Sequence, residues 1–559
     1  MTPTTVPLDI ASTTNAPAAA HPPGAANAAT STSTPAITDT APPADTPAIA
    51  NTSSSSNTAA TASHNANALT PRLIAGLTGI FLAAMIAGIN NRVGSLALAD
   101  LRGASGFGLD DGSWITTVYS AGELLAMPIA GWFAITLSLR RFHLMMLGTC
   151  SAIACVLPFV HDMGLLLILR ALQGLTAGAL IPLLMMAALR FLPPSIRLYA
   201  LALYSMTATF APNVSTWLAG LWTDQLLDLR MVYWQVIPAG LIAGLLVSWG
   251  VPQDMPKPER FGQANWFGLI FGALGLALVA VGLDQGNRLE WFASPLISTC
   301  LVVGLLLVAY YLFTEWHHPA PFIKLQLLSR RNLGLGFTIF FSLLVIFLSG
   351  SLLPSLHLGH TWDYRAQQSA PIGLMIGLPQ LIVAPAVSLL LYRKWVDARA
   401  VMALGLACLS LSCMMGAHLT SEWMWTEFIW AQSLQAIGQP LAVVALLFLS
   451  TSVVQPMEGP YVSGMVNLLR ALGTLAGSAA ISRLIELRTR FHSEMLLDHA
   501  ARAQAPAPAD LASTIAGQAA VLSIADAYWA LAAFAAILIP LVFALQYIPS
   551  PTAAMHPKH

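Results

Sequence analysis

The sequence predicts an all-α integral membrane protein, and three observations support that fold class. Of the 559 residues, 56% are hydrophobic and only 9% are charged, whereas soluble domains carry about 25% charged residues. The mean hydropathy over the whole chain is +0.69. Many stretches run for about 20 residues without a charge, which is the length that an α-helix needs to cross a bilayer. The net formal charge is zero, so composition gives no reason to expect a nucleic-acid partner.

Fourteen stretches are long and apolar enough to be spans. Their approximate ranges are 73–95, 114–136, 142–160, 165–189, 198–221, 233–250, 265–284, 295–314, 333–355, 370–391, 399–418, 428–452, 462–482 and 528–547. An even number of spans places both ends of the chain on the same side of the membrane.

The basic residues indicate which side that is. If the amino terminus is cytoplasmic, fourteen basic residues fall in cytoplasmic segments: Arg72, Arg140, Arg141, Arg190, Arg197, Lys257, Arg260, Lys324, Arg330, Arg331, Arg393, Lys394, Arg399 and Lys558. Five fall at the other side: Arg92, Arg102, Arg230, Arg288 and Arg365. Short cytoplasmic loops carry the excess of Lys and Arg, so we expect both termini in the cytoplasm.

Two segments differ from the spans. Residues 1–70 are rich in Ala, Thr, Ser and Pro, and such a segment cannot bury enough apolar surface to fold, so we expect a disordered cytoplasmic tail. Residues 483–527 form the one long extracytoplasmic segment. It begins as a charged helix continuing the thirteenth span and is broken at "AQAPAPAD". It is either a docking site for a partner or a solvated connector.

Glu123 is the only acid deep inside a span, in "TTVYSAGELLAMPIAGWFA". A charge at mid-membrane is costly unless it faces protein or water, so this carboxylate must point inward. Thr116 and Tyr119 precede it by seven and four residues, on the same helix face. We predict a proton or cation site here; a structural carboxylate hydrogen-bonded to a neighbouring helix is the alternative.

Two arginines are also buried in spans. Arg170 shares a helix face with Gln173, and it is a candidate partner for Glu123 because an arginine cannot lose its proton. Arg470 follows Asn467 by three residues on the thirteenth span. Each arginine has either a functional role or a role in packing.

Uncharged polar stripes run along two further spans. The fifth span carries Ser205, Thr209 and Asn213, and the twelfth carries Gln432, Gln435 and Gln439. Hydrogen bonding between helices explains any one stripe alone. Together, the stripes predict a polar substrate cavity lined by Tyr119, Gln173, Ser205, Thr209, Asn213, Gln432, Gln435, Gln439, Asn467 and Arg470.

Four stretches carry a resemblance to a known family. They are "LRALQGLTAGALIPLLMMAALRFLPPSIRLYALALYSMTATFAP", "GWFAITLSLRRF", "DQGNRLEWFAS" and "NLLRALGTLAGSAAISRLIELRTRFHSEML". They resemble the fourteen-helix drug:proton antiporter group of the major facilitator superfamily, EmrB/QacA type, over roughly residues 72 to 550. The resemblance implies two six-helix halves around a central cavity, 71–262 and 321–559, with two helices inserted between them at 263–320.

The resemblance also implies function and partners. Members of the EmrB type are proton-driven exporters of the inner membrane that move small amphipathic molecules. They work with a periplasmic adaptor of the EmrA type and an outer-membrane channel of the TolC type. The loop between the second and third spans is then a gating loop, with Gly131, Arg140 and Arg141 at its motif positions.

The chain departs from the family pattern at the coupling site. The family has an Asp late in the first span, and Asn90 stands at that place; Ala99 replaces a proline further on. The antiporter motif of the fifth span has Ser215 and Thr216 where the family has a Gly-Pro pair. We expect that Glu123, together with Asn90 and Arg170, has taken over proton coupling; binding of a cationic substrate group is the alternative.

The sequence therefore predicts a proton-coupled efflux permease for amphipathic compounds or drugs. A transport-inactive relative that acts as a sensor or assembly factor, and a dedicated metabolite exporter, are the alternatives. No HExxH, nucleophile elbow or Walker A pattern is present, which disfavours an enzyme and an ATP-driven pump. We expect no cofactor and no metal.

Overall fold

A computed structural model describes residues 70–502 and 510–550. The predicted tail lies outside the described residues apart from Thr70, and so does the Pro/Ala stretch at 503–509. The described residues form helices and no strands. The helices are α2 (Pro71–Leu96), α3 (Leu98–Ser105), α4 (Leu109–Leu137), α5 (Leu139–Val156), α6 (Met163–Phe191), α7 (Pro194–Gly220), α8 (Met231–Trp234), α9 (Val236–Gly250), α10 (Trp266–Gln285), α11 (Pro295–His317), α12 (Arg331–Trp362), α13 (Ala366–Leu391), α14 (Ala398–Gly416), α15 (Ile429–Thr451), α16 (Gly459–Arg502) and α17 (Leu511–Phe543).

All fourteen predicted spans coincide with long helices of this set. Within the described residues, thirteen helices are long and apolar enough to cross a membrane. The fourteenth is α7, which overlaps the predicted span 198–221. Its hydropathy is lower because Ser205, Thr207, Thr209 and Asn213 replace apolar residues along it.

Local signals in the sequence set several helix starts. Thr70 caps α2, because its hydroxyl accepts a hydrogen bond from the Leu73 amide at 3.2 Å and Pro71 occupies the first turn. The Asp162 carboxylate caps α6 by accepting from the Leu165 amide at 2.7 Å. These caps satisfy amide groups that a helix leaves without intrahelical partners.

Two glycines let α4 and α6 cross at close range. A Cβ at Gly122 would lie 2.2 Å from the Ala171 carbonyl oxygen, and one at Gly174 would lie 2.1 Å from the Tyr119 oxygen. Any larger residue would force the helices apart. Small residues at such crossings are typical of packed membrane helices, and this crossing fixes the orientation of the α4 face that carries Glu123.

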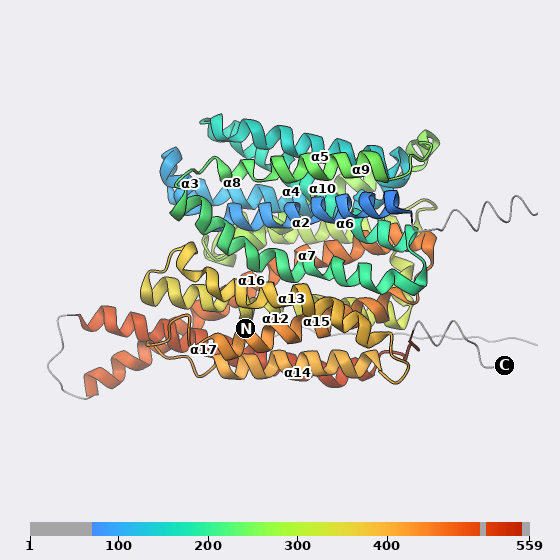
Figure 1. Ribbon diagram of the computed structural model, residues 1–559. Helices are drawn as coiled ribbons and strands as arrows, with labels where there is room; N and C mark the ends of the chain where they lie inside the picture. The colour runs from blue at the N-terminus through green and yellow to red at the C-terminus, as the bar shows by residue number, and fades with distance from the viewer. Residues whose placement is uncertain (1–69, 503–509, 551–559) are drawn as a thin grey trace, which may run out of the picture. The chain divides into compact units, whose positions relative to one another are not determined.

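The helix bundle has two faces that matter below. We call the face where α2 begins the N face (Figure 1). The segment after α17 lies there too: the Asn332 side chain, at the start of α12, accepts a hydrogen bond from the Gln546 amide at 2.7 Å. At the opposite face α16 and α17 project beyond the other helices, and we call it the hairpin face.

The projecting hairpin refines the prediction for residues 483–527. As expected, α16 continues the thirteenth span; its 44 residues correspond to about 66 Å, more than twice the apolar thickness of a bilayer. The part from Leu511 onward is helical as well and continuous with the last span. The predicted span started only at residue 528, so the helix begins 17 residues earlier than expected. Asp526 joins the two helices, because it pairs with Arg488 at 2.5 Å and His492 at 2.7 Å.

Candidate functional site

A cavity of about 300 Å³ lies between α2, α4, α7, α10, α12 and α16. One wall is apolar and contains Leu344, Phe347 and Leu348 of α12. The lining from the other helices includes four charged residues: Arg92, Glu123, Asp284 and Arg470. The cavity therefore offers a charged side and an apolar side to the same bound molecule.

Glu123 lies on the α4 wall of this cavity and is 8% exposed. Its carboxylate accepts a hydrogen bond from the Asn91 side-chain amide of α2. No ion pair of Glu123 is present among the described residues. Thr116 and Ser120 share its cavity-facing side of α4. The carboxylate thus has one neutral partner and access to the cavity.

Of the two residues predicted to share the α4 face of Glu123, Thr116 lines the cavity and Tyr119 does not. Tyr119 is fully buried and points away from the cavity lining, with its hydroxyl accepting a hydrogen bond from Asn90 at 3.2 Å. The residue of the first span that contacts Glu123 is Asn91, one position after the predicted Asn90. One residue corresponds to about 100° around a helix, so Asn90 faces the packed interior while Asn91 faces the cavity.

Arg470 is the cationic counterpart on α16. It is 8% exposed, lines the cavity, and donates one hydrogen bond from Nη1 to the Thr207 hydroxyl of α7 at 2.8 Å. It forms no ion pair among the described residues. A guanidinium offers five donors, so most of its hydrogen-bonding capacity remains directed at the cavity.

Arg170 does not pair with Glu123, which corrects the expectation from sequence. It is 1% exposed and donates to Gln173 Oε1 at 2.7 Å. Its guanidinium lies over the rings of Tyr119 and Tyr233, at 4.5 Å and 5.7 Å from the ring centroids. A cation over an aromatic face is stabilised without a carboxylate, so Arg170 and Gln173 belong to the packing of α6 against its neighbours.

The predicted stripe on α7 faces helix contacts rather than the cavity. Ser205, Thr209 and Asn213 each hydrogen-bond to a carbonyl of their own helix three or four residues earlier. A Cβ at Gly373 of α13 would lie 2.3 Å from the Asn213 carbonyl oxygen, so this side of α7 is occupied by α13. The cavity instead receives Thr207, Ala208 and Pro212.

The glutamine stripe of α15 forms a buried hydrogen-bond chain. Gln432 donates to the Gly350 carbonyl at 3.0 Å, Gln435 to the Ser349 hydroxyl at 2.8 Å, and Gln439 to Gln435 at 3.2 Å. None of the three lines the cavity. Asn467 is likewise buried, accepting from the Tyr204 hydroxyl at 3.0 Å. These amides hold helices together, which was the alternative explanation for them.

The seam between α4, α6 and α16 is closed between the cavity and the N face. A Cβ at Gly131 would lie 2.5 Å from the Pro460 carbonyl oxygen, and one at Gly464 would lie 2.8 Å from that of Pro128. Ser463 donates to the Pro182 carbonyl. Of the predicted gating-loop residues, Gly131 is therefore part of this closed seam, whereas Arg141 is exposed and Arg140 half-buried.

Sequence analysis missed three cavity residues. Asn91 has no predicted role, because Asn90 stands at the position of the family's acid. Arg92 is counted only as a basic residue near the end of the first span, yet it lines the cavity and its Nε has no hydrogen-bond partner. Asp284 is the last residue of the predicted span 265–284 and has no predicted role; it lies in the last turn of α10 and lines the cavity. The signal for Arg92 was present, since it follows Asn91 directly inside a helical stretch.

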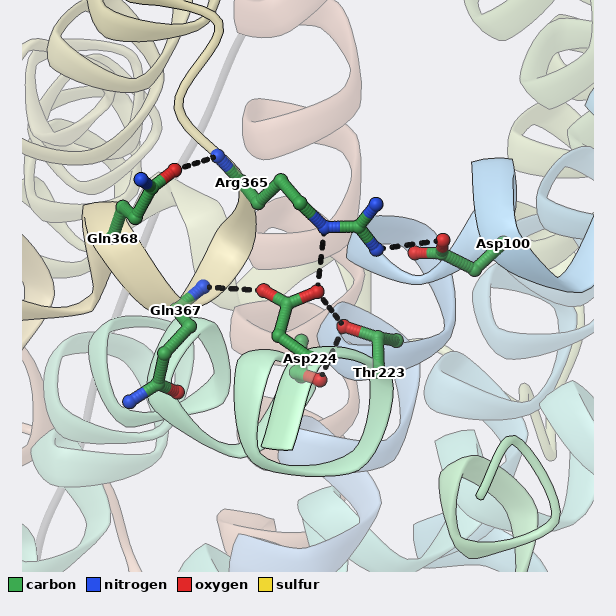
Figure 2. A network of polar contacts seen from close by, with 7 residues as sticks. Asp100, Thr223, Asp224, Arg365, Gln367 and Gln368 are labelled. Atoms are coloured by element: carbon green, nitrogen blue, oxygen red, sulfur yellow. Dashed lines mark hydrogen bonds and ion pairs between the residues drawn. The ribbon is translucent and has the colours of Figure 1, made fainter. Parts of the chain in front are cut away.

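A second charged cluster lies on the hairpin face, and we call it the Arg365 network. Arg365 precedes α13 and pairs with Asp224 at 2.7 Å and with Asp100 of α3 at 2.8 Å. Asp224 also accepts from the Gln367 amide at 3.0 Å and from the Thr223 hydroxyl at 3.1 Å. Figure 2 shows one guanidinium between two carboxylates from separate segments. It ties the segments after α2 and α7 to the start of α13.

Partial burial of the Asp224 carboxyl opposes its ionisation, but the hydrogen bonds from Gln367, Arg365 and Thr223 outweigh that effect, so its pKa lies below the ordinary value. The carboxylate of Asp224 is therefore ionised across the working pH range. Within the described residues, no three His, Cys, Asp or Glu side chains gather as metal ligands.

Within the described residues, thirteen helices meet the length and hydropathy of membrane spans and α7 is the fourteenth long helix, which is the architecture of a multi-pass membrane protein. Residues 80–478 match the model of the Major Facilitator Superfamily, and the chain belongs to that superfamily. The fold is the one that this family implies, with two six-helix halves and two inserted helices, α10 and α11.

Curated relatives agree with this assignment at low identity. The chain is 24% identical over 435 residues to the fatty acid resistance protein FarB of Neisseria gonorrhoeae, covering 75% of this chain and 82% of that protein. It is 23% identical to the multidrug export protein EmrB of Haemophilus influenzae, over 76% of this chain and 83% of the relative. The match to EmrB of Escherichia coli K12 is 25% identical and spans 54% of this chain and 60% of that protein's length.

Solved structures show the same fold. The human organic anion transporter MFSD10 superposes with a TM-score of 0.53 at 14% identity, covering 85% of this chain and all of that one. A peptide transporter POT in complex with sulfate gives a TM-score of 0.52 at 16% identity, covering 84% and 95%. These likenesses concern the fold alone.

Proposed function

We propose that this protein is a proton-coupled efflux permease that exports amphipathic organic compounds across the inner membrane. The observation that carries the proposal is the cavity itself, where Glu123 and Arg470 face a shared space with the apolar wall of α12. An amphipathic molecule can place its polar group at the charged walls and its apolar part against Leu344 and Phe347. The names of the relatives, which include multidrug export and fatty acid resistance proteins, support a substrate of this kind.

Glu123 is the proposed coupling residue. The Glu123 side chain, whose hydrogen-bond partner is the neutral amide of Asn91, can be either protonated or ionised, because no ion pair with a described residue fixes it in the ionised form. Arg470 of α16 lines the same cavity. A change in the separation of α4 and α16 then changes the proton affinity of Glu123, which links protonation to conformation. Asn90 and Arg170, proposed from sequence as part of this site, are assigned the support of Tyr119 and α4 instead.

The orientation of the chain in the membrane is also part of the proposal. The excess of Lys and Arg on the N-face segments favours a cytoplasmic N face and an external hairpin face, with both termini in the cytoplasm. We divide the chain accordingly into a cytoplasmic tail (1–70), an amino-terminal half (71–262), the inserted helices (263–320) and a carboxy-terminal half (321–559). Reporter fusions at residues 505 and 556 should read outside and inside; the same side for both contradicts this orientation.

The projecting hairpin of α16 and α17 is the proposed contact for a periplasmic adaptor of the EmrA type, which a TolC-type channel would continue. The hairpin extends beyond the rest of the bundle (Figure 1). The ion pair between Arg488 and Asp526 joins its two helices, so it offers an ordered surface for a partner. Deleting 500–520 should spare membrane insertion and lower export across the envelope when the adaptor is present. Unchanged export in that strain would reduce the hairpin to a connector.

The test of the proposed function is transport by the purified full chain in proteoliposomes. An imposed proton gradient should drive uphill movement of an amphipathic probe from a panel of ethidium, decanoate and chloramphenicol, and an uncoupler should abolish it. Movement of none of the three, in vesicles that hold the gradient, would favour the alternative of a transport-inactive sensor or assembly factor.

A further inference from the structure

The inserted helix α10 contributes directly to the central cavity. Its last turn places Asp284 on the cavity lining, beside residues from α4 and α16. Helix α10 packs against α4 on one side and α16 on the other. An inserted helix therefore closes the seam between the two halves at this point and adds a carboxylate to the site.

Hydrogen bonds hold the last turn of α10 against the first turns of α4. Thr117 donates to the Asp284 carboxylate, and Gln285 Nε2 donates to the Thr117 hydroxyl at 2.6 Å. Arg288, just beyond the helix, donates to Gln285 Oε1 at 2.6 Å and pairs with Asp110 at 2.5 Å. Asp284 is thus held in position by one neutral donor, the Thr117 hydroxyl, while Arg288 is paired with Asp110.

Asp284 and Glu123 are held at different levels of α4. Thr117, which donates to Asp284, precedes Glu123 by six residues, so these two positions are about 9 Å apart along the α4 axis. The hydroxyls of Thr116 and Ser120 line the cavity between them. Asp284 is nearer the hairpin face, because α10 ends at that face.

The cavity lining differs toward the two faces. Toward the hairpin face, Ser95, Thr116 and Ser478 continue the polar lining. Toward the N face, the backbone contacts of Gly131 and Gly464 close the seam between α4 and α16. Asp284 is exposed whereas Glu123 is only 8% exposed, so of the two carboxylates Asp284 is the one more accessible to water.

We propose that Asp284 is a second proton-binding carboxylate, which takes protons from the hairpin-face side and passes them to Glu123. The proposal rests on the proposed proton-coupled function and adds a residue and a path to it. The step is a proton transfer: an Asp284 oxygen gains a proton from hydronium, which leaves water. The proton then passes to a Glu123 oxygen through the hydroxyls of Thr116 and Ser120 or through water, each relay oxygen gaining one O–H bond and losing another.

The charged groups around Asp284 are consistent with this role. The other charged residues of the cavity lining are Arg92, Glu123 and Arg470, and the ion pair of Asp110 and Arg288 lies at the hairpin-face end of α4 and α10. Helix α11, which also packs on α10, carries no charged residue between Pro295 and Thr314. Asp284 forms no ion pair among the described residues, so no salt bridge must break when it takes up a proton.

The test compares Asp284→Asn with Asp110→Asn in the full chain. Asp110 belongs to the same hydrogen-bonded end of α4 and α10 but does not line the cavity, so its variant controls for structural effects. In proteoliposomes we expect Asp284→Asn to slow proton uptake by about tenfold or more, shift the pH profile of transport, and leave downhill exchange of the same probe intact. Added formate, a small carboxylate, should restore part of the rate, and Asp284→Glu should retain most of it.

Two results would overturn the proposal: an Asp284→Asn protein with the wild-type rate and pH profile, or equal losses in both variants without rescue by formate. Failure of the underlying function has a different signature, because the wild-type protein itself would then move no probe with the proton gradient. Transport coupled to protons in the wild type, with Asp284→Asn indistinguishable from it, rejects the role of Asp284 alone.

Discussion

The cavity and the Arg365 network use the same residue types in opposite ways. In the network one guanidinium is shared by two carboxylates at 2.7 Å and 2.8 Å. In the cavity two arginines and two acids line one space, yet none forms an ion pair among the described residues. Paired charges near the surface hold segments together, whereas Glu123 and Arg470 are buried without an ion-pair partner among the described residues, which is costly. The difference indicates that the cavity charges are kept for binding and the network charges for assembly.

Solvent exposure follows the same division. The Arg365 side chain is 57% exposed, so each ion pair there adds little to stability. Glu123 and Arg470 are both 8% exposed, where desolvation makes every interaction of a charge stronger. Substitutions in the two regions should therefore affect different measurements: stability in the network and transport in the cavity.

The largest effect is expected for Arg470→Gln. Loss of a charge-assisted contact to a bound molecule should lower transport by about 100-fold, while the midpoint of thermal unfolding stays equal or rises because an unpaired buried charge is removed. Arg170→Gln is the matched control. Because Arg170 is packed on Tyr119, this variant should lower the stability of the protein rather than its transport rate per folded molecule. A fall in stability for Arg470→Gln, with normal transport per folded molecule, would place Arg470 in the packing class.

A smaller effect is expected for Arg365→Ala, and on stability rather than on transport. The substitution leaves Asp100 and Asp224 facing each other without the cation between them, which should cost about 1–2 kcal/mol after allowance for exposure. Denaturant unfolding of the protein in detergent measures this difference. If transport falls while stability is unchanged, the network has a role in the transport cycle that pairing alone does not explain.

The two acids of the network should differ from each other. Asp224 accepts hydrogen bonds from Arg365, Gln367 and Thr223, so Asp224→Asn should destabilise the protein by about 1 kcal/mol. Asp100 contacts only Arg365 and should contribute less than about 0.5 kcal/mol. Equal losses for Asp100→Asn and Asp224→Asn would show that charge alone, and not the amide and hydroxyl partners, stabilises the network.

The pH dependence of stability should separate the regions further. Because the pKa of Asp224 is lowered from its ordinary value of 3.8, its contribution is present above that value and is lost as the pH falls through the folded-state pKa. The stability difference between wild type and Asp224→Asn should stay constant from pH 8 to pH 5 and shrink only below about pH 4. A difference that closes between pH 7 and pH 5 would contradict the assignment.

Much of the fold follows from the sequence, because uncharged stretches of membrane length can satisfy their backbone groups only as helices. The buried charges Glu123, Arg170 and Arg470 were also identifiable, since each interrupts an apolar stretch. What the sequence could not assign was the neighbour that each polar face meets. A helix inside a fourteen-helix bundle has several inward faces, so the stripes of α7 and α15 could equally face packing contacts or the cavity.

The cavity residues that were missed show the same limit. Asn90 and Asn91 differ by one helix position, and only the packing of α2 against α4 decides which one meets Glu123. Asp284 reaches the cavity only because the inserted helix α10 packs between α4 and α16. Contacts between helices distant in sequence have no local signal.

The central claim is that Glu123 carries the coupling proton, and substrate-induced proton release in proteoliposomes tests it most directly. Wild-type protein should release protons on addition of a transported probe. Glu123→Gln should release none and lose uphill transport, yet retain binding and downhill exchange; Glu123→Asp should retain part of both with a shifted pH profile. Because Asn91 contacts Glu123, Asn91→Asp in the Glu123→Gln background is the variant expected to restore coupling. A Glu123→Gln protein that still moves protons with the probe at the wild-type ratio would contradict the account, and Glu123 would then be a structural or substrate-binding residue.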